Sequence, residues 1–270
     1  MSIRHAVIMC VYKNDKEQDI KLAIESIINQ SIKNHLYIYI DGVVNNKVKD
    51  LLGVYSSNKN IFIFESEINH GLAYGLNFLI DKILPCKYDF ISRMDSDDIS
   101  LPDRLFLQEK FLDMNKSIDV IGGYCTEFGS EFALKVKKVP LEHNDIVNYS
   151  ALRCPFIHPT VMFRSRVFDS NIRYPVNTYY SEDLALWYIL LANGYKFANI
   201  PEILLKYRIT EDTLFRRKGF FKAKCEAVLR WDYMKKMKII SPMKCTMLII
   251  KMISQILPIF ILKVLYKKYR

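Results

Sequence analysis

The sequence predicts an α/β fold with a mostly parallel central sheet. In the first hundred residues, short runs rich in Val, Ile, Phe and Tyr alternate with stretches in which apolar residues recur at helical spacing. The 270 residues are half hydrophobic with nine glycines and nine prolines, a composition typical of a packed protein. Strand–helix–strand order implies helices on both faces of the sheet and ligands at the carboxyl ends of its strands.

The elements follow in chain order. Strands are expected at residues 6–12, 36–40, 61–65 and 89–93, with helices at 20–29 and 71–83. Helix 20–29 is the clearest, because its apolar residues fall at the i, i+3, i+4, i+7 and i+8 positions of one helix face. Later we expect a helix over 102–114, strands near 119–122 and 160–163, a helix over 182–193 ending before Gly194, and an extended segment at 196–208.

Charge divides the chain in two. Residues 214–270 hold 15 Lys/Arg and 2 acidic residues, whereas residues 1–213 hold 24 and 27. We therefore expect a slightly acidic domain over 1–213 and a basic helical extension over 214–270. The six cysteines form no CxxC pair, which indicates reduced thiols. The N-terminus shows no signal-peptide pattern, so we expect the protein on the cytoplasmic side.

The strongest chemical signal is an acidic cluster directly after an apolar strand. Asp95, Asp97 and Asp98 place three carboxylates within four residues. Such carboxylates repel one another unless a cation joins them, and Mg²⁺ is usually held by one or two carboxylates together with substrate phosphates. The alternative is a solvated acidic turn before the next helix. The preceding strand favours a site, because it directs the acids to the ligand edge of the sheet.

The cluster and its surroundings resemble family 2 glycosyltransferases with a GT-A fold, a Rossmann-like architecture. Residues 92–104 are similar to the family's DxD segment, and 7–14 are similar to its opening strand and nucleotide-facing loop. Residues 38–42, 69–77 and 181–187 resemble its second strand, its Asn-x-Gly helix start and its Glu-Asp helix. These five segments stand in the family's order.

The resemblance implies the reaction and its residues. It implies that Asp183 is the general base for the acceptor hydroxyl and that Glu182 positions the acceptor or orients the base. Asp97 and Asp95 would hold Mn²⁺ or Mg²⁺. The residues implied to contact the donor are Tyr12, Asp41, Asn69, Gly71, Asn77, Arg93 and Asp95.

The sequence matches the family's pattern less fully at the acceptor side and at the diphosphate site. His158 lies in a segment similar to one that leads to the family's acceptor side, and Trp187 should share a helix face with Asp183. After Arg208 the chain lacks the histidine and serines that help many relatives close over the diphosphate. Arg208, Arg216 and Arg217 are the candidate replacements.

Most of these residues also have structural interpretations. Tyr12 could be an ordinary aromatic residue at a strand end, and Asp41 with Gly42 a plain turn. The Asn69–Gly71 segment could simply begin a helix. Glu182 and Asp183 could complement a helix dipole.

The basic tail points to a membrane. Residues 246–262 are apolar apart from Lys251, Ser254 and Gln255, too short and interrupted for a spanning helix. We expect an amphipathic helix at an anionic membrane surface, the alternative being a hairpin packed on the body. This favours a peripheral enzyme at the cytoplasmic face of a bacterial inner membrane, with a polyprenyl-diphosphate-linked acceptor.

The resemblance thus implies an inverting transferase that moves one sugar from a nucleotide sugar, by family habit a UDP-sugar, in O-antigen, capsule or exopolysaccharide synthesis. A nucleotidyltransferase is the first alternative, but residues 7–15 lack the glycine-rich phosphate loop it would normally show. A non-catalytic protein that binds membrane or nucleic acid through the tail is the second. It leaves the acidic cluster unexplained, and an apolar basic helix suits lipid better, so we expect no nucleic-acid partner.

Overall fold

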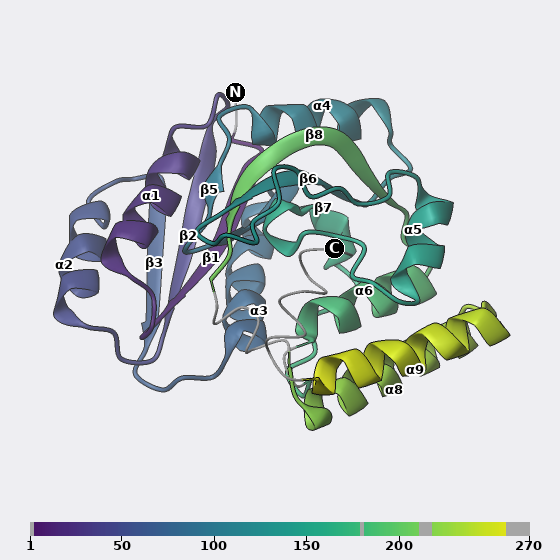
Figure 1. The fold of residues 1–270 in the computed structure, drawn as a ribbon. Coiled ribbons are helices and arrows are strands. Elements are labelled where there is room, and N and C mark those ends of the chain that lie inside the picture. Colours follow the sequence, from purple (N-terminus) through teal and green to yellow (C-terminus); the bar gives the residue numbers. More distant parts are fainter. Residues whose placement is uncertain (1–2, 179–180, 211–217, 258–270) are drawn as a thin grey trace.

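A computed structural model describes residues 3–178, 181–210 and 218–257 (Figure 1). Its strands are β1 (His5–Tyr12), β2 (Asn34–Asp41), β3 (Ile61–Ser66), β4 (Phe90–Asp95), β5 (Ile99–Ser100), β6 (Val120–Phe128), β7 (Met162–Arg164) and β8 (Phe197–Arg208). Its helices are α1 (Glu17–Ile28), α2 (Asn46–Tyr55), α3 (Leu72–Ile83), α4 (Arg104–Met114), α5 (His143–Ser150), α6 (Glu182–Ala192), α8 (Phe220–Lys236) and α9 (Pro242–Ile256). The α/β class predicted from the sequence is confirmed.

All eight strands belong to one sheet in the order β3-β2-β1-β4-β7-β6-β8-β5. Strands β3, β2, β1 and β4 run parallel, as the strand–helix alternation predicted. The second half is mixed, because β7 pairs antiparallel with β4 and β6, and β5 pairs antiparallel with β8. Strand β6 is longer than expected, and helices α2 and α5 were not predicted. Both of those helices are short, at 10 and 8 residues, which gives a weak periodic signal.

Helices cover both faces of the sheet. The apolar residues of α1 pack with those of α2 and α4 in one buried cluster, and those of α3, α5 and α6 form the cluster on the other face. Helix α3 packs tightly on β1 and β2 at Gly75, where a Cβ atom would come within 2.7 Å of the Tyr39 ring and 2.9 Å of Cys10 Sγ. A larger residue here would push α3 away from the sheet.

Parallel register brings three distant segments to one edge. Tyr12 at the end of β1 is the register partner of Asp41 at the end of β2. On the other side of β1, Cys10 is the partner of Asp95 at the end of β4. The loops that follow β1, β2 and β4 therefore lie next to one another, at the lower side of the sheet in Figure 1.

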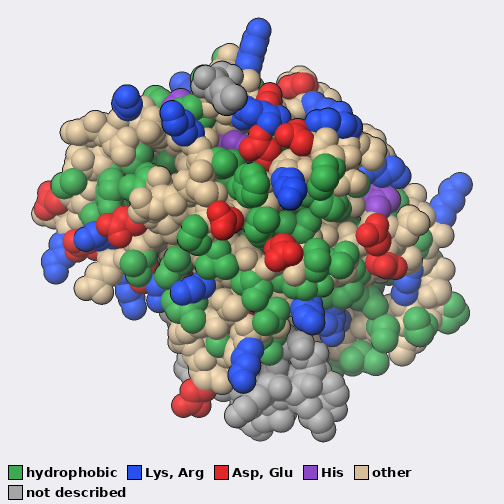
Figure 2. All heavy atoms as spheres, turned by 90° about the horizontal axis from the view of Figure 1, so that it is seen from above, with side chains coloured by type: hydrophobic (Ala, Val, Ile, Leu, Met, Phe, Trp, Pro, Cys, Tyr) green, Lys and Arg blue, Asp and Glu red, His purple; other side chains and the backbone are tan. Residues whose placement is uncertain are grey.

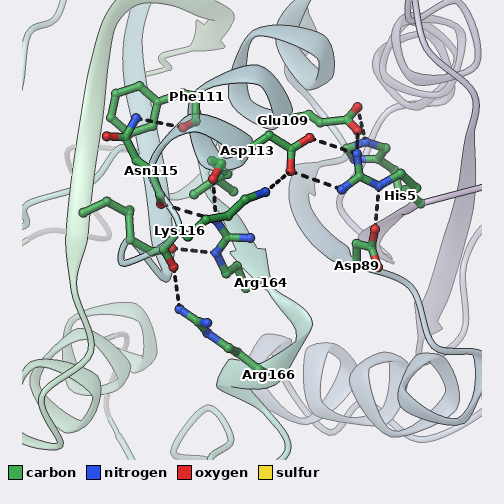
Figure 3. Close-up of polar contacts among 12 residues, drawn as sticks. His5, Asp89, Glu109, Phe111, Asp113, Asn115, Lys116, Arg164 and Arg166 are labelled. Atoms are coloured by element: carbon green, nitrogen blue, oxygen red, sulfur yellow. Dashed lines mark hydrogen bonds and ion pairs between the residues drawn. The ribbon is translucent and has the colours of Figure 1, made fainter.

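The opposite edge is held by an ion-pair network. Arg4 contacts Asp89, Glu109 and Asp113, and Glu109 also lies 3.0 Å from the ring of buried His5 (Figure 3). This network ties the start of β1 to α4. Figure 2 views the molecule from above in Figure 1 and shows acidic and basic side chains interspersed on this face. The described residues of this face therefore carry charges of both signs side by side.

Helices α8 and α9 form an antiparallel pair. The N–H of Gly219 before α8 donates to the carbonyl of Gln255 near the end of α9, at 3.0 Å. The pair packs on the body through α8, where Tyr233 stacks on Tyr188 of α6 at a centroid distance of 4.0 Å. The predicted boundary between residues 213 and 214 and the expected apolar residues 258–262 lie outside the described residues. Among the described helices, none has the length and hydrophobicity needed to cross a bilayer.

Candidate active site

The acidic cluster lies where β4 ends. Asp95, Asp97 and Asp98 each present a carboxylate oxygen, and these oxygens lie within 4.8 Å of one another. Asp95 and Asp97 are partly exposed, whereas Asp98 is fully buried. Three like charges at this separation repel one another strongly in a protein interior. Binding of a cation or of a proton would reduce this repulsion.

Asp98 carries the clearest sign of a missing positive partner. Its Oδ1 accepts a 2.6 Å hydrogen bond from the N–H of Arg208, while its Oδ2 is buried with no hydrogen-bond partner among the described residues. Burial, together with the charges of Asp95 and Asp97, raises the pKa of Asp98 well above its ordinary value. A buried oxygen without a hydrogen-bond partner, in a group of three carboxylates, fits a divalent cation, which prefers oxygen ligands. The resemblance implies Asp97 and Asp95 as metal ligands, and in the structure Asp98 lies in the same group of carboxylates.

Arg93 connects the acidic cluster to the other end of the site. Its guanidinium is buried and forms an ion pair with Asp95, whereas Nε and Nη1 lack hydrogen-bond partners within the described chain. Its charge also acts on Glu182, where it opposes the rise of that pKa, and on His158. Arg93 thus lies within electrostatic reach of both groups of acids.

The predicted donor residues around β2 form a hydrogen-bonded turn. The carboxylate of Asp41 accepts from the N–H of His70 at 2.7 Å and from that of Gly71 at 2.8 Å. The side-chain amide of Asn69 donates to the carbonyl of Asp41 at 3.1 Å. Gly71 has φ 90°, a conformation that favours glycine, and α3 begins directly after it. In this structure Asp41 shapes the loop beside Tyr12.

Two other predicted residues support the site from within. Asn77 exchanges two 2.8 Å hydrogen bonds with the backbone of Tyr174, and the Tyr174 hydroxyl lies 3.0 Å from His158 Nε2. Burial and the charge of Arg93 lower the pKa of His158 well below its ordinary value, so its ring is neutral at pH 7. Trp187, expected as an aromatic wall beside Asp183, is fully buried and stacks on Phe163. It does not face an acceptor here, because the helix turn that carries it packs against the sheet.

Glu182 and Asp183 form the first turn of α6. Asp183 Oδ1 accepts from the N–H of Leu184 at 2.7 Å, and Oδ2 lies 3.5 Å from Sγ of Cys154, a thiol donor. Burial and the neighbouring charge of Asp183 raise the pKa of Glu182. Both carboxylates are partly exposed, so an incoming hydroxyl has access to them. No pattern in the sequence pointed to Cys154.

Arg208, a candidate for the diphosphate contact, lies beside the acidic loop and has several partners there. Its guanidinium pairs with Asp19 of α1 at 2.7 Å, donates to the carbonyl of Asp97 at 2.9 Å and lies over the ring of Phe128. It therefore braces the acidic loop from the side of β8. Arg216 and Arg217, the other two candidates for a diphosphate contact, lie outside the described residues.

Comparison with known proteins adds the family. The sequence model of glycosyl transferase family 2 matches residues 6–172. The amylovoran biosynthesis glycosyltransferase AmsE of Erwinia amylovora is 27% identical over 98% of both chains. An Escherichia coli enzyme, UDP-Gal:alpha-D-GlcNAc-diphosphoundecaprenol beta-1,3-galactosyltransferase, is 32% identical over 80% of this chain and 78% of its own.

Solved structures share the fold. TarS 1–349 of S. aureus in complex with UDP-GlcNAc superimposes with a TM-score of 0.63 at 14% identity, covering 92% of this chain and 79% of that one. The mannosyltransferase PcManGT of Pyrobaculum calidifontis, in complex with GDP-Man and Mn²⁺, gives 0.64 at 13% identity, covering 92% and 73%. At these identities the likeness shows the architecture, which is the GT-A fold.

Proposed function

This chain belongs to glycosyl transferase family 2 and is a glycosyltransferase; from that premise we propose that it transfers one hexose or N-acetylhexosamine unit from a nucleotide sugar to a lipid-linked saccharide in surface polysaccharide synthesis. The observation that carries the proposal is the juxtaposition around Arg93. This buried cation pairs with Asp95 of the acidic cluster and acts electrostatically on Glu182 at the start of α6. A leaving-group site and a base site are thus within reach of one guanidinium.

The leaving group departs at the acidic cluster. Asp95, Asp97 and Asp98 would hold Mn²⁺ or Mg²⁺, and the bound cation would supply positive charge that stabilises the departing diphosphate. The orphaned Oδ2 of Asp98 supports this assignment. The Mn²⁺ in the PcManGT complex supports it by analogy of fold.

The acceptor is activated at α6. Asp183 takes the proton of the acceptor hydroxyl as the new bond to the anomeric carbon forms and the bond to the diphosphate oxygen breaks. A single displacement of this kind inverts the anomeric centre. Cys154 and the N–H of Leu184 hold the two oxygens of Asp183, and Glu182 beside it binds or orients the acceptor.

The nucleotide binds at the loops after β1 and β2. Tyr12 stacks on the base, and the loop that Asp41 organises with Asn69 and Gly71 lines the opposite side. UDP is the proposed nucleotide, supported by the name of the Escherichia coli galactosyltransferase and by the ligand of TarS 1–349. The same galactosyltransferase supports a polyprenyl-diphosphate acceptor, since its name specifies diphosphoundecaprenol.

A membrane-facing surface would suit such an acceptor, and α9 has an unusual orientation for this purpose. Its polar residues face the protein: Lys244 donates to Asn148 of α5, and Lys251 and Gln255 reach Glu226 of α8. Leu248 is buried against the body and Met252 packs beside it, but most other apolar residues of α9 face outward. Those exposed are Met243, Met247, Ile249, Ile250, Ile253 and Ile256.

A soluble surface helix normally shows the reverse pattern. An exposed apolar stripe of this length marks a surface that another phase or molecule covers. The exposed charges of the same hairpin are mostly basic, since Lys224, Lys235, Lys236 and Lys238 outnumber Asp232. Apolar insertion combined with positive charge favours an anionic membrane surface. The enzyme would then act peripherally at the cytoplasmic face of a bacterial inner membrane.

The test is transfer by the purified full chain. A panel of UDP- and GDP-sugars would be supplied with a polyprenyl-diphosphate-sugar acceptor and Mn²⁺ or Mg²⁺, and then with EDTA. We expect metal-dependent turnover that Asp97→Ala and Asp183→Asn both abolish, with donor binding retained in Asp183→Asn. Asp145→Asn is the matched control, because Asp145 is an exposed acid in the first turn of α5. Full activity of Asp183→Asn would contradict the assignment of Asp183 as the base. Turnover unaffected by EDTA would contradict the metal requirement.

A further inference from the structure

Asp15 links the loop after β1 to the acidic loop after β4. Its Oδ2 accepts two hydrogen bonds, one from the N–H of Tyr12 at 3.0 Å and one from the hydroxyl of Ser96 at 2.7 Å. Its own N–H donates to the carbonyl of Tyr12 at 3.0 Å. One carboxylate oxygen therefore holds the residue proposed to stack on the base and the serine between two proposed metal ligands.

The link joins two segments that are 81 residues apart in the chain. Parallel pairing of β1 with β4 brings their ends together, and Ser96 is 7% exposed, so water competes little for its hydroxyl. The Asp15–Ser96 hydrogen bond ties one loop of the site to another.

A second set of contacts fixes the acidic loop from the opposite side. Arg208 binds the carbonyl of Asp97 and the carboxylate of Asp98 through its side chain and backbone, and it pairs with Asp19 in the first turn of α1. The acidic loop is thus held on one side by Asp15, which follows β1, and on the other by Arg208, the last residue of β8. Movement of the acidic loop toward a cation would pull on the Tyr12 loop through Ser96.

We propose that the Asp15–Ser96 hydrogen bond couples the nucleobase loop to the metal loop, so that base and cation bind cooperatively through the protein. Asp15 is then a positioning residue that touches neither ligand. The proposal rests on the proposed function, because it takes the loop after β1 as the base site and the loop after β4 as the metal site. By linkage, each ligand tightens the other by the same factor.

The experiment uses uridine, which has no phosphate with which to contact the cation directly. Dissociation constants of uridine are measured by NMR titration of the full chain with and without saturating Mg²⁺, and those of UDP by calorimetry. In the wild type we expect Mg²⁺ to tighten uridine about fivefold, at the lower end of measured couplings. In Ser96→Ala and Asp15→Ala the factor should fall to within about twofold of unity.

Three comparisons make the result specific. Asp15→Asn keeps an oxygen that accepts from Ser96, so most of the coupling should persist if the hydrogen bond matters and vanish if only the charge does. Ser56→Ala removes an equivalent 2.7 Å hydroxyl bond, to Gly53 at the end of α2, and should leave the coupling unchanged. UDP should keep its dependence on Mg²⁺ in Ser96→Ala, because its diphosphate meets the cation directly.

Each outcome either supports or overturns the proposed coupling. Wild-type uridine binding that is indifferent to Mg²⁺, or undiminished coupling in Ser96→Ala, would overturn the proposal while UDP and Mg²⁺ still bind. Loss of coupling in Asp15→Asn would overturn it in favour of a charge effect. If the wild type binds no UDP in the presence of Mg²⁺, the proposed function fails and the coupling fails with it.

Discussion

The N–H of Arg208 donates a 2.6 Å hydrogen bond to Oδ1 of Asp98, across 110 positions of the chain. The bond joins the end of β8 to the loop after β4 and holds a fully buried carboxylate beside two others. It leaves Oδ2 of Asp98 without a partner among the described residues. A solvated acidic turn would not bury one of its acids, so the burial of Asp98 supports the cation site that we propose.

Asp98→Asn should weaken Mn²⁺ binding at least tenfold, the scale on which even outer ligands of a metal site act. Asp98 has a raised pKa in the free protein and must lose its proton to bind a cation. Wild-type affinity for Mn²⁺ should therefore rise with pH until that carboxyl ionises, and the variant should show a flatter dependence. Calorimetric titration with Mn²⁺ at several pH values measures both effects, with Asp145→Asn as the control. Equal affinities and equal pH slopes would remove Asp98 from the site.

Glu182→Gln separates the two acids of α6. Because the role proposed for Glu182 is to position the acceptor, the variant should lose up to about a hundredfold in kcat/KM, whereas Asp183→Asn should lose about a thousandfold or more in kcat. The pKa of Glu182 is raised by burial and by Asp183, so this group gains its proton early as the pH falls. The acidic limb of the kcat/KM profile should move to lower pH in Glu182→Gln. A greater loss of kcat in Glu182→Gln than in Asp183→Asn would exchange the two roles.

Cys154 should tolerate serine better than alanine. Burial raises the pKa of its thiol, so the thiol stays protonated at neutral pH and can donate to Asp183 Oδ2. Serine keeps a donor, and alanine removes it. A net hydrogen bond of about 1 kcal/mol corresponds to a loss of roughly fivefold in kcat for Cys154→Ala. Steady-state kinetics on both variants test this, and equal activity of all three proteins would show that the contact is incidental.

Glu226 should stabilise the α8–α9 hairpin in a pH-dependent way. Burial alone would raise its pKa, but the charges of Lys251 and Arg230 lower it from the ordinary 4.5 to about 2. A carboxyl with a depressed folded-state pKa stabilises the protein fully above 4.5, and this contribution is lost as the pH falls from 4.5 toward 2. This lowering of the pKa corresponds to a contribution of about 3 kcal/mol to the free energy of unfolding.

Denaturant unfolding of Glu226→Gln measures this contribution. At pH 7 the free energy of unfolding of the variant should fall by about 3 kcal/mol, because Arg230 keeps a buried charge without its partner. Near pH 3 the difference from the wild type should be much smaller, because the stabilising effect of the Glu226 charge is then partly lost in the wild type too. Glu202→Gln provides an exposed control on β8. The same loss at both pH values would indicate a packing effect instead.

Vesicle sedimentation tests the outward face of α9. Met247→Glu and Ile250→Glu should each weaken binding to vesicles rich in anionic phospholipid by roughly tenfold, because each removes an apolar side chain from the lipid contact. Val54→Glu, an equally apolar exposed site on α2, is the matched control. Binding of the wild type to duplex DNA but not to vesicles at physiological salt would favour a nucleic-acid surface instead.

Local patterns predicted much of this protein. The apolar spacing of residues 20–29 matches α1, and the β-rich runs match β1 to β4, because amphipathic periodicity is a property of consecutive residues. The acids of the DxD segment and of α6 were located for a similar reason, since each group lies within a few residues of chain. Helices α2 and α5 were missed, because short helices leave little periodic signal.

Tertiary structure decided the relationships that no local pattern encodes. Strand register placed Tyr12 beside Asp41, and the return of β8 delivered Arg208 to Asp98 and Asp97. Packing buried Trp187, which helical spacing alone had placed on one helix face with Asp183. It also turned the polar residues of α9 inward, toward Glu226. Such contacts depend on which segments meet after the chain has folded, and that is set by long-range packing rather than by neighbouring residues.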